Sequence, residues 1–302
     1  MDSIILVFLC MLAGVGLQRV KAFPANAYVA LNQFVIYISL PALALYYIPK
    51  ITVSTKLLFP LGIAWIGFFL SLLFFIVLGK VFKWSKKLTG CLILTAGLGN
   101  TSFVGFPIIE ALYGNQGLET AIIVDQPGTF MVMATLGIIV ATAYSKESTG
   151  TGAMLRKILL FPPFFAFFAG LCMNIAGYDF IGDVQSVLSR LGSTVTPVAL
   201  VAVGMQLKIE RKSKHWRFLT LGLFFKLILT PAFFYILYKL ILNQDGLQTE
   251  VSIMEAAMAP MITASILAAT NGLKPRLAGM MIGIGIPLSF ITLAFWYWIL
   301  NM

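Results

Sequence analysis

Three ionisable side chains lie inside long apolar stretches of this 302-residue sequence: Asp125, Lys226 and Glu255. A charge in such surroundings costs roughly 2.5–3.5 kcal/mol to insert into a bilayer, so each is a candidate for ion coupling. Asp125, followed by Gln126, favours a proton- or substrate-linked role, with structural pairing to a neighbouring helix as the alternative. Lys226 could pair with Asp125, receive an anion or extend to the membrane surface. Glu255 could lie at the outer interface, and Glu110 is expected to cap a helix or face water.

A run of helix-disrupting residues interrupts one apolar stretch: Gly97-Leu98-Gly99-Asn100-Thr101-Ser102-Phe103-Val104-Gly105-Phe106-Pro107. Pro107 has no amide hydrogen and disturbs the preceding turn. Unpaired backbone is costly in lipid, so a break here must face protein or line a cavity. The amides freed at the start of the second half-helix suit an anion. We predict breaks at Gly99 and Pro107, with substrate ligands at Asn100, Thr101 and Ser102; a simple kink is the alternative.

A second interruption is predicted at Pro260, near the middle of the apolar segment 250–270. Small residues around this proline would allow another helix to cross closely. A second half-helix should then begin near Met261, which places Met261 and Thr263 beside the break as substrate contacts.

The sequence favours no metal, cofactor or catalytic chemistry. Cys10, Cys91 and Cys172 lie singly in apolar stretches, and His215 is the only histidine. Neither a zinc-type cluster nor a disulfide framework fits this spacing. Because the sequence also offers no nucleophile–base pair or phosphate loop, we expect a protein that is not an enzyme.

Composition indicates that the solvent of this chain is lipid. Hydrophobic residues make up 60% and charged residues 11% of the sequence, with a mean hydropathy of +0.95. Soluble domains carry about 25% charged residues. A bilayer-spanning helix needs about 20 apolar residues. Ten segments satisfy this requirement and predict an all-α membrane protein with ten transmembrane helices: 3–20, 27–48, 57–82, 89–113, 119–144, 158–176, 184–207, 216–242, 250–270 and 276–300.

The loop charges predict an orientation. Of the 21 Lys and Arg residues, Lys226 lies inside a span, sixteen fall on one side of the ten spans and four fall on the other: Lys50, Lys56, Arg190 and Lys239. Cytoplasmic loops carry the positive excess, so both termini should lie outside an inner or plasma membrane. The N-terminal segment lacks the basic start of a signal peptide and is interpreted as the first span. Basic residues scattered in short loops do not form a nucleic-acid surface.

The loop from Ser145 to Lys157 divides the ten spans into two sets of five. An odd number of spans per half gives the halves opposite orientations, which predicts an inverted repeat over 1–150 and 151–302. A single offset aligns Gly14 with Gly170 and Pro41 with Pro197. The two broken spans, the fourth and the ninth, are then symmetry partners, and carriers of this kind bind substrate where such breaks meet.

The residues from Gly99 to Pro107 resemble the auxin efflux carrier family, whose bacterial members include malate and malonate permeases and whose plant members export auxin. Further similarities are spread along the chain: Leu31–Gln33, Leu40–Leu43, Ala111–Gly114, Asp125–Gln126, Pro197–Leu200, Gly204–Met205 and Glu255–Met258 with Pro260. The resemblance implies a fold related to bile-acid sodium symporters, in which the fourth and ninth spans cross at their breaks. It also implies a scaffold of spans 1, 2, 6 and 7, a transport domain of spans 3–5 and 8–10, and an elevator mechanism.

The resemblance also implies residue roles. Asn100 and Gln126 match substrate-site positions of the family, and Pro107 and Pro260 match its crossing prolines. Plant carriers typically have an apolar residue where this chain has Asp125, which favours an organic anion other than auxin.

The predicted function is secondary transport of a small organic anion, a carboxylate, driven by the proton gradient or the membrane potential. Sodium coupling stays open, as does a membrane sensor or receptor with a transporter fold. The expected partners are the substrate, a coupling proton or sodium ion, and lipid, without nucleic acid; a homodimer is left open.

Overall fold

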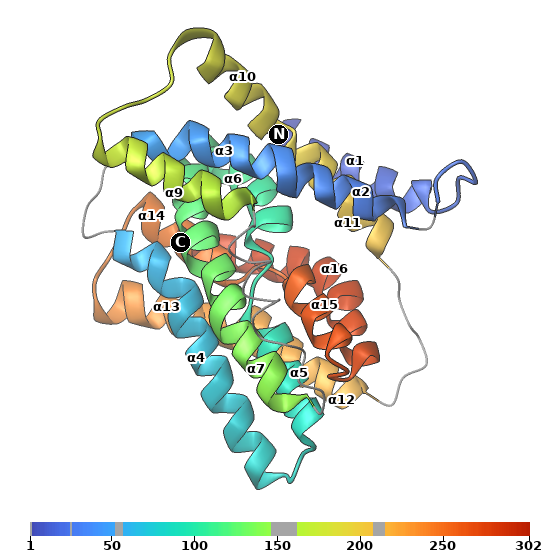
Figure 1. Cartoon of the computed structure of the whole chain (residues 1–302). Coiled ribbons are helices and arrows are strands. Elements are labelled where there is room, and N and C mark those ends of the chain that lie inside the picture. The colour runs from blue at the N-terminus through green and yellow to red at the C-terminus, as the bar shows by residue number, and fades with distance from the viewer. Residues whose placement is uncertain (1, 25, 52–56, 146–161, 208–214) are drawn as a thin grey trace. The chain divides into compact units, whose positions relative to one another are not determined.

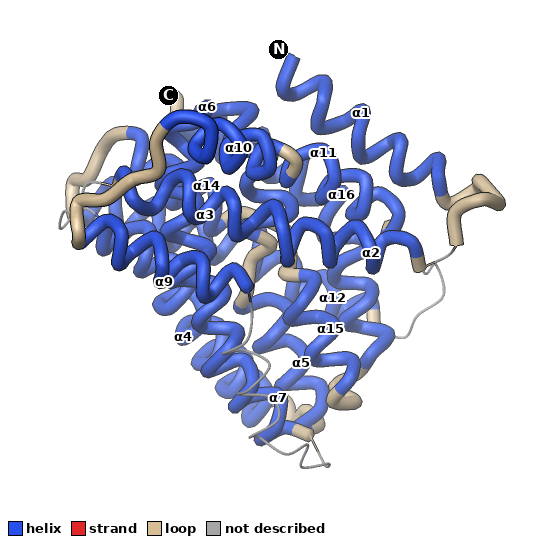
Figure 2. Tube along the Cα trace, turned by 45° about the horizontal axis from the view of Figure 1, so that its top comes forward, coloured by secondary structure: helices blue, strands red, loops and turns tan. Residues whose placement is uncertain are grey.

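A computed structural model of the protein describes residues 2–24, 26–51, 57–145, 162–207 and 215–302 (Figure 1). Within these ranges every regular element is helical, and the one strand-like contact is an isolated antiparallel bridge between Gly99 and Pro260. Figure 2 shows helices and loops but no strand among the described segments. The predicted all-α class is therefore confirmed for this part of the chain.

The described residues form two compact units. The first comprises Met1–Thr55, Ser102–Ile122 and Leu155–Leu207, and the second comprises Lys56–Thr101, Ile123–Met154 and Lys208–Met302. The boundary predicted between the halves 1–150 and 151–302 lies outside the described residues. The inverted repeat therefore stays a prediction.

The first unit is built from helices and short tightened or widened turns, labelled η; η2 is a 3-10 turn and the other η segments are π-helical. In chain order its elements are α1 (Asp2–Leu17), α2 (Ala27–Phe34), η1 (Val35–Ser39), α3 (Leu40–Tyr47), η2 (Ile48–Lys50), η4 (Thr101–Gly105), α6 (Phe106–Ile123), α9 (Pro162–Ile175), α10 (Gly182–Ser193) and α11 (Val195–Gln206). The end residues Thr101 and Ile123 count with the second unit.

Two glycines allow α1 and α11 to pack with their backbones in contact. A methyl group on Gly204 would meet the carbonyl oxygen of Met11, and one on Gly14 would meet that of Val201. Small residues permit this kind of close crossing between apolar helices. The side-chain amide of Gln18 also donates to the carbonyl of Gly204 at 2.8 Å, which fixes the end of α1 against α11.

The second unit is centred on helices that are apolar on every side. Its elements are α4 (Leu58–Val81), α5 (Lys86–Gly97), η5 (Val124–Phe130), η6 (Met133–Gly137), α7 (Ile138–Tyr144), α12 (Trp216–Phe224), η7 (Phe225–Leu229), α13 (Thr230–Tyr235), η8 (Ile236–Ile241), α14 (Leu247–Ala256), α15 (Ile262–Thr270) and α16 (Pro275–Leu300). Ser85 caps α5 by accepting the amide of Leu88 at 3.3 Å. From Leu88 to Ala96 every residue of α5 is buried, as expected for a helix surrounded by other helices.

Among the residues that the structure describes, six helical segments are long and apolar enough to cross a bilayer: Ala27–Lys50, Leu58–Val81, Thr101–Tyr144, Gly182–Gln206, Trp216–Ile241 and Pro275–Leu300. Two shorter apolar helices cover Ile5–Leu17 and Phe165–Ile175. Each of the ten predicted ranges contains helix, although the start of 158–176 falls outside the described residues. The exact number of spans stays a prediction.

Candidate functional site

Two helical paths in the second unit are interrupted. The first path leaves helical geometry between Gly97, the last residue of α5, and Thr101, the first residue of η4. The second path does so between Ala256, the last residue of α14, and Ile262, the first residue of α15. Both interruptions are short and lie in sequence regions where breaks were expected.

The two interruptions are hydrogen-bonded to each other. The amide of Asn100 donates to the carbonyl of Ala259 at 2.7 Å, and the amide of Met261 donates to the carbonyl of Leu98 at 2.9 Å. These bonds flank the antiparallel bridge and give partners to backbone groups that the helices release. Such partners are required when non-helical backbone lies deep in a membrane protein. The breaks therefore support each other as one crossing.

The predicted break at Pro107 does not coincide with an interruption. Pro107 is the second residue of α6, which follows η4 directly, and it belongs to the first unit. The π-helical turn Thr101–Gly105 runs directly into α6, so the helical segment continues through Pro107, and a widened turn before a proline accommodates the hydrogen bond that its missing amide cannot make. Ser102, a predicted substrate contact, also belongs to the first unit.

Asp125 in η5 connects to the residue that follows the first interruption. The hydroxyl of Thr101 donates to Oδ1 of Asp125 at 2.6 Å, and Nε2 of Gln126 donates to Oδ2 at 3.1 Å. All three side chains are buried. The carboxylate is therefore positioned at the crossing by a hydroxyl and an amide.

The side chains of Lys226 and Glu255 are both buried. Lys226 is 3% exposed and its Nζ donates to the carbonyl of Ala256 at 2.8 Å, so its side chain does not extend to the surface. Glu255 is 0% exposed, so its side chain is buried within the second unit. It is the residue before the last of α14, which ends at the crossing.

A cavity of about 10 Å³ lies beside the crossing. Two buried charged side chains, Lys226 and Glu255, line it together with Gly99, Thr101, Thr129 and Thr230. This volume is close to the minimum that one water occupies. Thr129 and Thr230 were not predicted from the sequence; their hydroxyls donate to carbonyls five residues earlier, at 3.3 and 3.0 Å. The local sequence around a threonine in an apolar helix does not show whether the side chain lines a cavity or only packs against a neighbouring helix.

Most of the predicted site residues therefore lie in one compact unit. The second unit contains both interruptions, the buried charges and the start of α15: Gly99, Asn100, Thr101, Asp125, Gln126, Lys226, Glu255, Pro260, Met261 and Thr263. Trp65, which the sequence analysis did not single out, adds a hydrogen bond of 3.1 Å from its indole nitrogen to the carbonyl of Pro127.

Comparison with known proteins identifies the family. A family model described as membrane transport protein matches residues 1–297. The chain belongs to this family. An uncharacterized transporter of Methanocaldococcus jannaschii is 27% identical over 309 aligned residues, which cover 99% of this chain and 98% of that protein. An uncharacterized transporter of Methanothermobacter thermautotrophicus is 28% identical over 208 residues, which cover 68% of this chain and 66% of that protein.

Membership of the membrane transport protein family confirms the resemblance to auxin efflux carriers that the sequence indicated. Together with the long apolar helices, it establishes a multi-pass membrane protein that acts as a transporter. The substrate and the coupling ion are not given by either relative, because both are named only as uncharacterized transporters.

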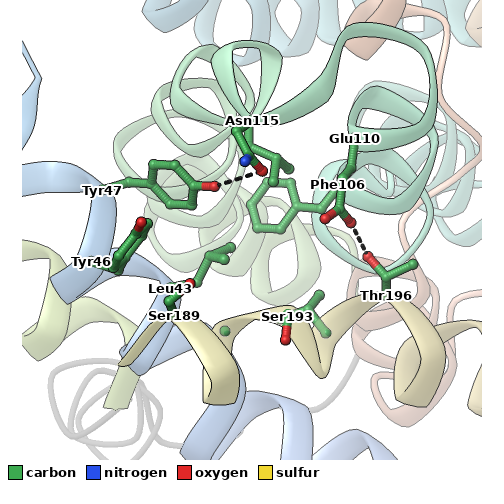
Figure 3. Close-up of a pocket in the computed structure, with 12 residues that line it drawn as sticks. Leu43, Tyr46, Tyr47, Phe106, Glu110, Asn115, Ser189, Ser193 and Thr196 are labelled. Atoms are coloured by element: carbon green, nitrogen blue, oxygen red, sulfur yellow. Dashed lines mark hydrogen bonds between the residues drawn. The ribbon is translucent and has the colours of Figure 1, made fainter. Parts of the chain in front are cut away.

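This transporter has a second polar pocket, in the first unit (Figure 3). Its volume is about 70 Å³, and it holds two side-chain hydrogen bonds: Thr196 to Glu110 at 2.6 Å and Tyr47 to Asn115 at 3.2 Å. The space suits a few waters. Glu110, which was expected from the sequence to cap a helix or face water, lines this pocket, whose described lining residues include no basic side chain. The cavity at the crossing has Lys226 in its lining together with Glu255, and a positive charge favours an anion. The crossing is therefore the better candidate for an anion carrier.

Gly285 of α16 packs directly on the crossing of this transporter. A methyl group there would lie 2.7 Å from Cδ of Pro260 and 2.9 Å from Cδ2 of Leu223. We expect Gly285→Ala to shift the Pro260 segment, to slow transport and to destabilise the protein by about 1–3 kcal/mol. Differential scanning fluorimetry and uptake measurements check this.

Gly279 on the same helix provides a matched control, since a methyl group there would meet no atom within 4 Å. Gly279→Ala should leave transport unchanged and should not lower the melting temperature, because alanine favours helix over glycine. Similar losses in both variants would contradict the close packing of α16 on Pro260.

Proposed function

We propose that the protein is a secondary transporter of a small organic anion, a carboxylate, which binds beside the crossing in the second unit. The observation that carries the proposal is the hydrogen-bonded pair of interruptions at Asn100 and Met261, surrounded by buried charged side chains. Interrupted helices that meet in this way form substrate and ion sites in inverted-repeat carriers. A purely structural crossing would not need three ionisable groups, each of which is costly in an apolar interior.

The backbone amides at the start of α15, the half-helix after the second interruption, favour an anion. The first amides of α15 have no partner within their own helix, and the positive end of the helix dipole points the same way. The side-chain amides of Asn100 and Gln126 each carry two hydrogens and can add donors for carboxylate oxygens, while the hydroxyl of Thr101 donates to Asp125. Met261 and Thr263 begin this half-helix and would contact the remainder of the substrate.

We further propose elevator-type alternating access in a ten-span inverted repeat, with residues 1–150 and 151–302 as the two repeats. The division into compact units supports a two-body mechanism, because predicted spans 1, 2, 6 and 7 fall in the first unit, spans 3 and 8–10 fall in the second, and span 5 belongs to the second from Ile123 onward. The fourth span is divided between the units after Thr101. In this proposal, both termini lie outside an inner or plasma membrane, which a reporter fused to each terminus would test.

The first test is uptake by the full chain in proteoliposomes with labelled malate and malonate, in the presence of a proton gradient. We expect saturable uptake and counterflow by the wild type. Asn100→Ala should lower uptake by about tenfold or more, because an amide that binds a charged carboxylate contributes about 1.5–3 kcal/mol. The folded fraction, measured by size-exclusion chromatography, should stay the same.

Asn301→Ala is the matched control, since Asn301 is exposed beyond the end of α16. It should transport like the wild type. Equal uptake by Asn100→Ala and Asn301→Ala would refute the site. A carboxylate that raises the melting temperature of the wild type without any flux would instead favour the sensor or receptor alternative.

A further inference from the structure

The buried charges at the crossing include one basic and two acidic side chains. Asp125 and Lys226 are each 3% exposed, and Glu255 is 0% exposed. They come from η5, η7 and α14, three elements of the second unit. Without the lysine, this interior would hold only negative side chains, which is the composition of a site for a cation.

Lys226 contacts both interruptions. Its Nζ donates to the carbonyl of Ala256 at 2.8 Å, and a methyl group on Gly99 would lie 3.0 Å from the same nitrogen. In a continuous helix, the carbonyl of Ala256 would accept the amide of residue 260, but Pro260 has no amide hydrogen. The ammonium thus supplies the donor that Pro260 lacks, at the negative end of the α14 dipole.

The carboxylate of Glu255 is also buried at the crossing. Neither of its carboxylate oxygens has a hydrogen-bond partner among the described residues, although both are buried. The side chain lines the small cavity together with Lys226 and Thr101. A buried carboxylate without hydrogen bonds is costly unless it meets a positive charge or a proton.

The charges on the surrounding elements do not replace Lys226. Those on α4, α5, α12 and α16 lie near the helix ends, α13 carries none, and Glu250 is in the first turn of α14; the titratable groups of these elements are Lys80, Lys86, Lys87, Cys91, Arg217, Tyr235, Glu250, Arg276 and Tyr297. Lys226 is therefore the basic side chain that lines the cavity at the crossing together with Glu255.

We propose that Lys226 is a tethered cation that occupies the place a free sodium ion would take at the crossing. Its ammonium binds the released carbonyl of Ala256 and balances the carboxylates of Asp125 and Glu255. A second cation at this place would meet like-charge repulsion in a cavity of about 10 Å³. Transport is consequently independent of sodium, and protons on the two carboxylates are left as the coupling ions.

This inference rests on the proposed carrier function, but its test needs no organic substrate. The melting temperature of the full chain in detergent is measured in sodium chloride and in choline chloride at equal ionic strength. The wild type should show no difference. Lys226→Met removes the charge at similar volume and opens a site with two carboxylates and a carbonyl. Its melting temperature should rise by several degrees in sodium relative to choline, because a ligand that binds only the native state stabilises it.

Two variants make the result specific. Lys239→Met removes a lysine from a surface pair with Asp245 and should stay insensitive to sodium. Lys226→Met combined with Glu255→Gln should lose the sodium response. If Lys226→Met yields no folded protein, Lys226→Gln also removes the charge, and its amide can keep the hydrogen bond to the carbonyl of Ala256; the two carboxylates and the oxygen of the new amide are then the sodium ligands.

Sodium stabilisation of the wild type would overturn the proposal, as would a folded Lys226 variant whose melting temperature is the same in sodium and choline. Failure of malate or malonate uptake would affect only the proposed substrate class, because the ion-dependent melting temperatures are measured without either compound.

Discussion

Asp125→Asn should uncouple transport from the proton gradient while leaving the protein folded. Asparagine has nearly the same shape as the buried carboxyl group but can neither bind nor release a proton. Thr101 can still donate to Oδ1, and Gln126 can rotate so that its own oxygen accepts from the new amide; that oxygen has no hydrogen-bond partner in the described structure. We expect the melting temperature to change little, because both hydrogen bonds can be kept.

The expected loss appears in net uptake. Uptake driven by an imposed proton gradient should fall by about tenfold for each pH unit of the gradient, because one pH unit is worth about 1.4 kcal/mol per proton and asparagine carries no proton. Counterflow of labelled malate or malonate at equal pH should be retained, because exchange does not require Asp125 to release its proton. Proteoliposome assays in the two modes separate these outcomes.

Asp245→Asn is the control, because the Asp245 side chain is 83% exposed in its pair with Lys239. It should behave as the wild type in both modes. Wild-type net uptake by Asp125→Asn would exclude a proton-linked role for Asp125. A folded fraction that falls together with uptake and counterflow would support the structural alternative, in which Asp125 serves only to hold η5 against Thr101.

The positions of the interruptions could be predicted because their signals are local. Gly99 has no Cβ and Pro260 has no amide hydrogen, and both properties are visible in the sequence. Their partners could not be predicted in the same way. The bond from Asn100 to the carbonyl of Ala259 joins residues that are distant in the chain, and it exists only after the two helical paths have crossed.

Pro107 shows why a breaking residue does not identify a break by itself. Its missing amide removes a hydrogen bond from the interior of a helix, but the chain can adapt by widening the preceding turn and need not leave helical geometry. The π-helical turn Thr101–Gly105 precedes Pro107 in this way, while the interruption itself lies earlier, near Gly99. The sequence contains both residues but does not rank them.

Lys226 illustrates a similar limit for charged residues. A lysine within an apolar span can be a buried functional residue, or its side chain can extend to the membrane surface. The sequence of this protein allowed both interpretations. The distinction depends on one acceptor, the carbonyl of Ala256, which is free because Pro260 follows four residues later. Lys226 thus donates to the carbonyl oxygen that Pro260 leaves without an amide partner. The spacing of side chains in the sequence does not predict this hydrogen bond.

The largest effect on stability is expected from Gly204→Ala. The added methyl group would run into the carbonyl oxygen of Met11 and would lie 3.0 Å from Cα of Gly14. These are backbone atoms, which cannot rotate away, so α1 and α11 would have to separate. Overpacking of this kind costs about 1–3 kcal/mol and sometimes more. The melting temperature and the folded fraction in detergent measure the loss.

Gly14→Ala should have a comparable effect, because its methyl group would meet Val201 and would lie 2.9 Å from Cα of Gly204. Gly16→Ala is the matched control on the same helix, since no atom lies within 4 Å of a methyl group at that position. It should be neutral or slightly stabilising. A wild-type melting temperature for Gly204→Ala would show that the two backbones do not touch in the membrane protein.

The double variant of Gly14 and Gly204 gives a sharper result than either single change. Both methyl groups would occupy the same narrow contact between α1 and α11, so the separation that admits the first also admits the second. The combined loss of stability should therefore be clearly smaller than the sum of the two single losses, as for residues that share one contact. Strictly additive losses would mean that the glycines act independently and that no single close crossing joins the two helices.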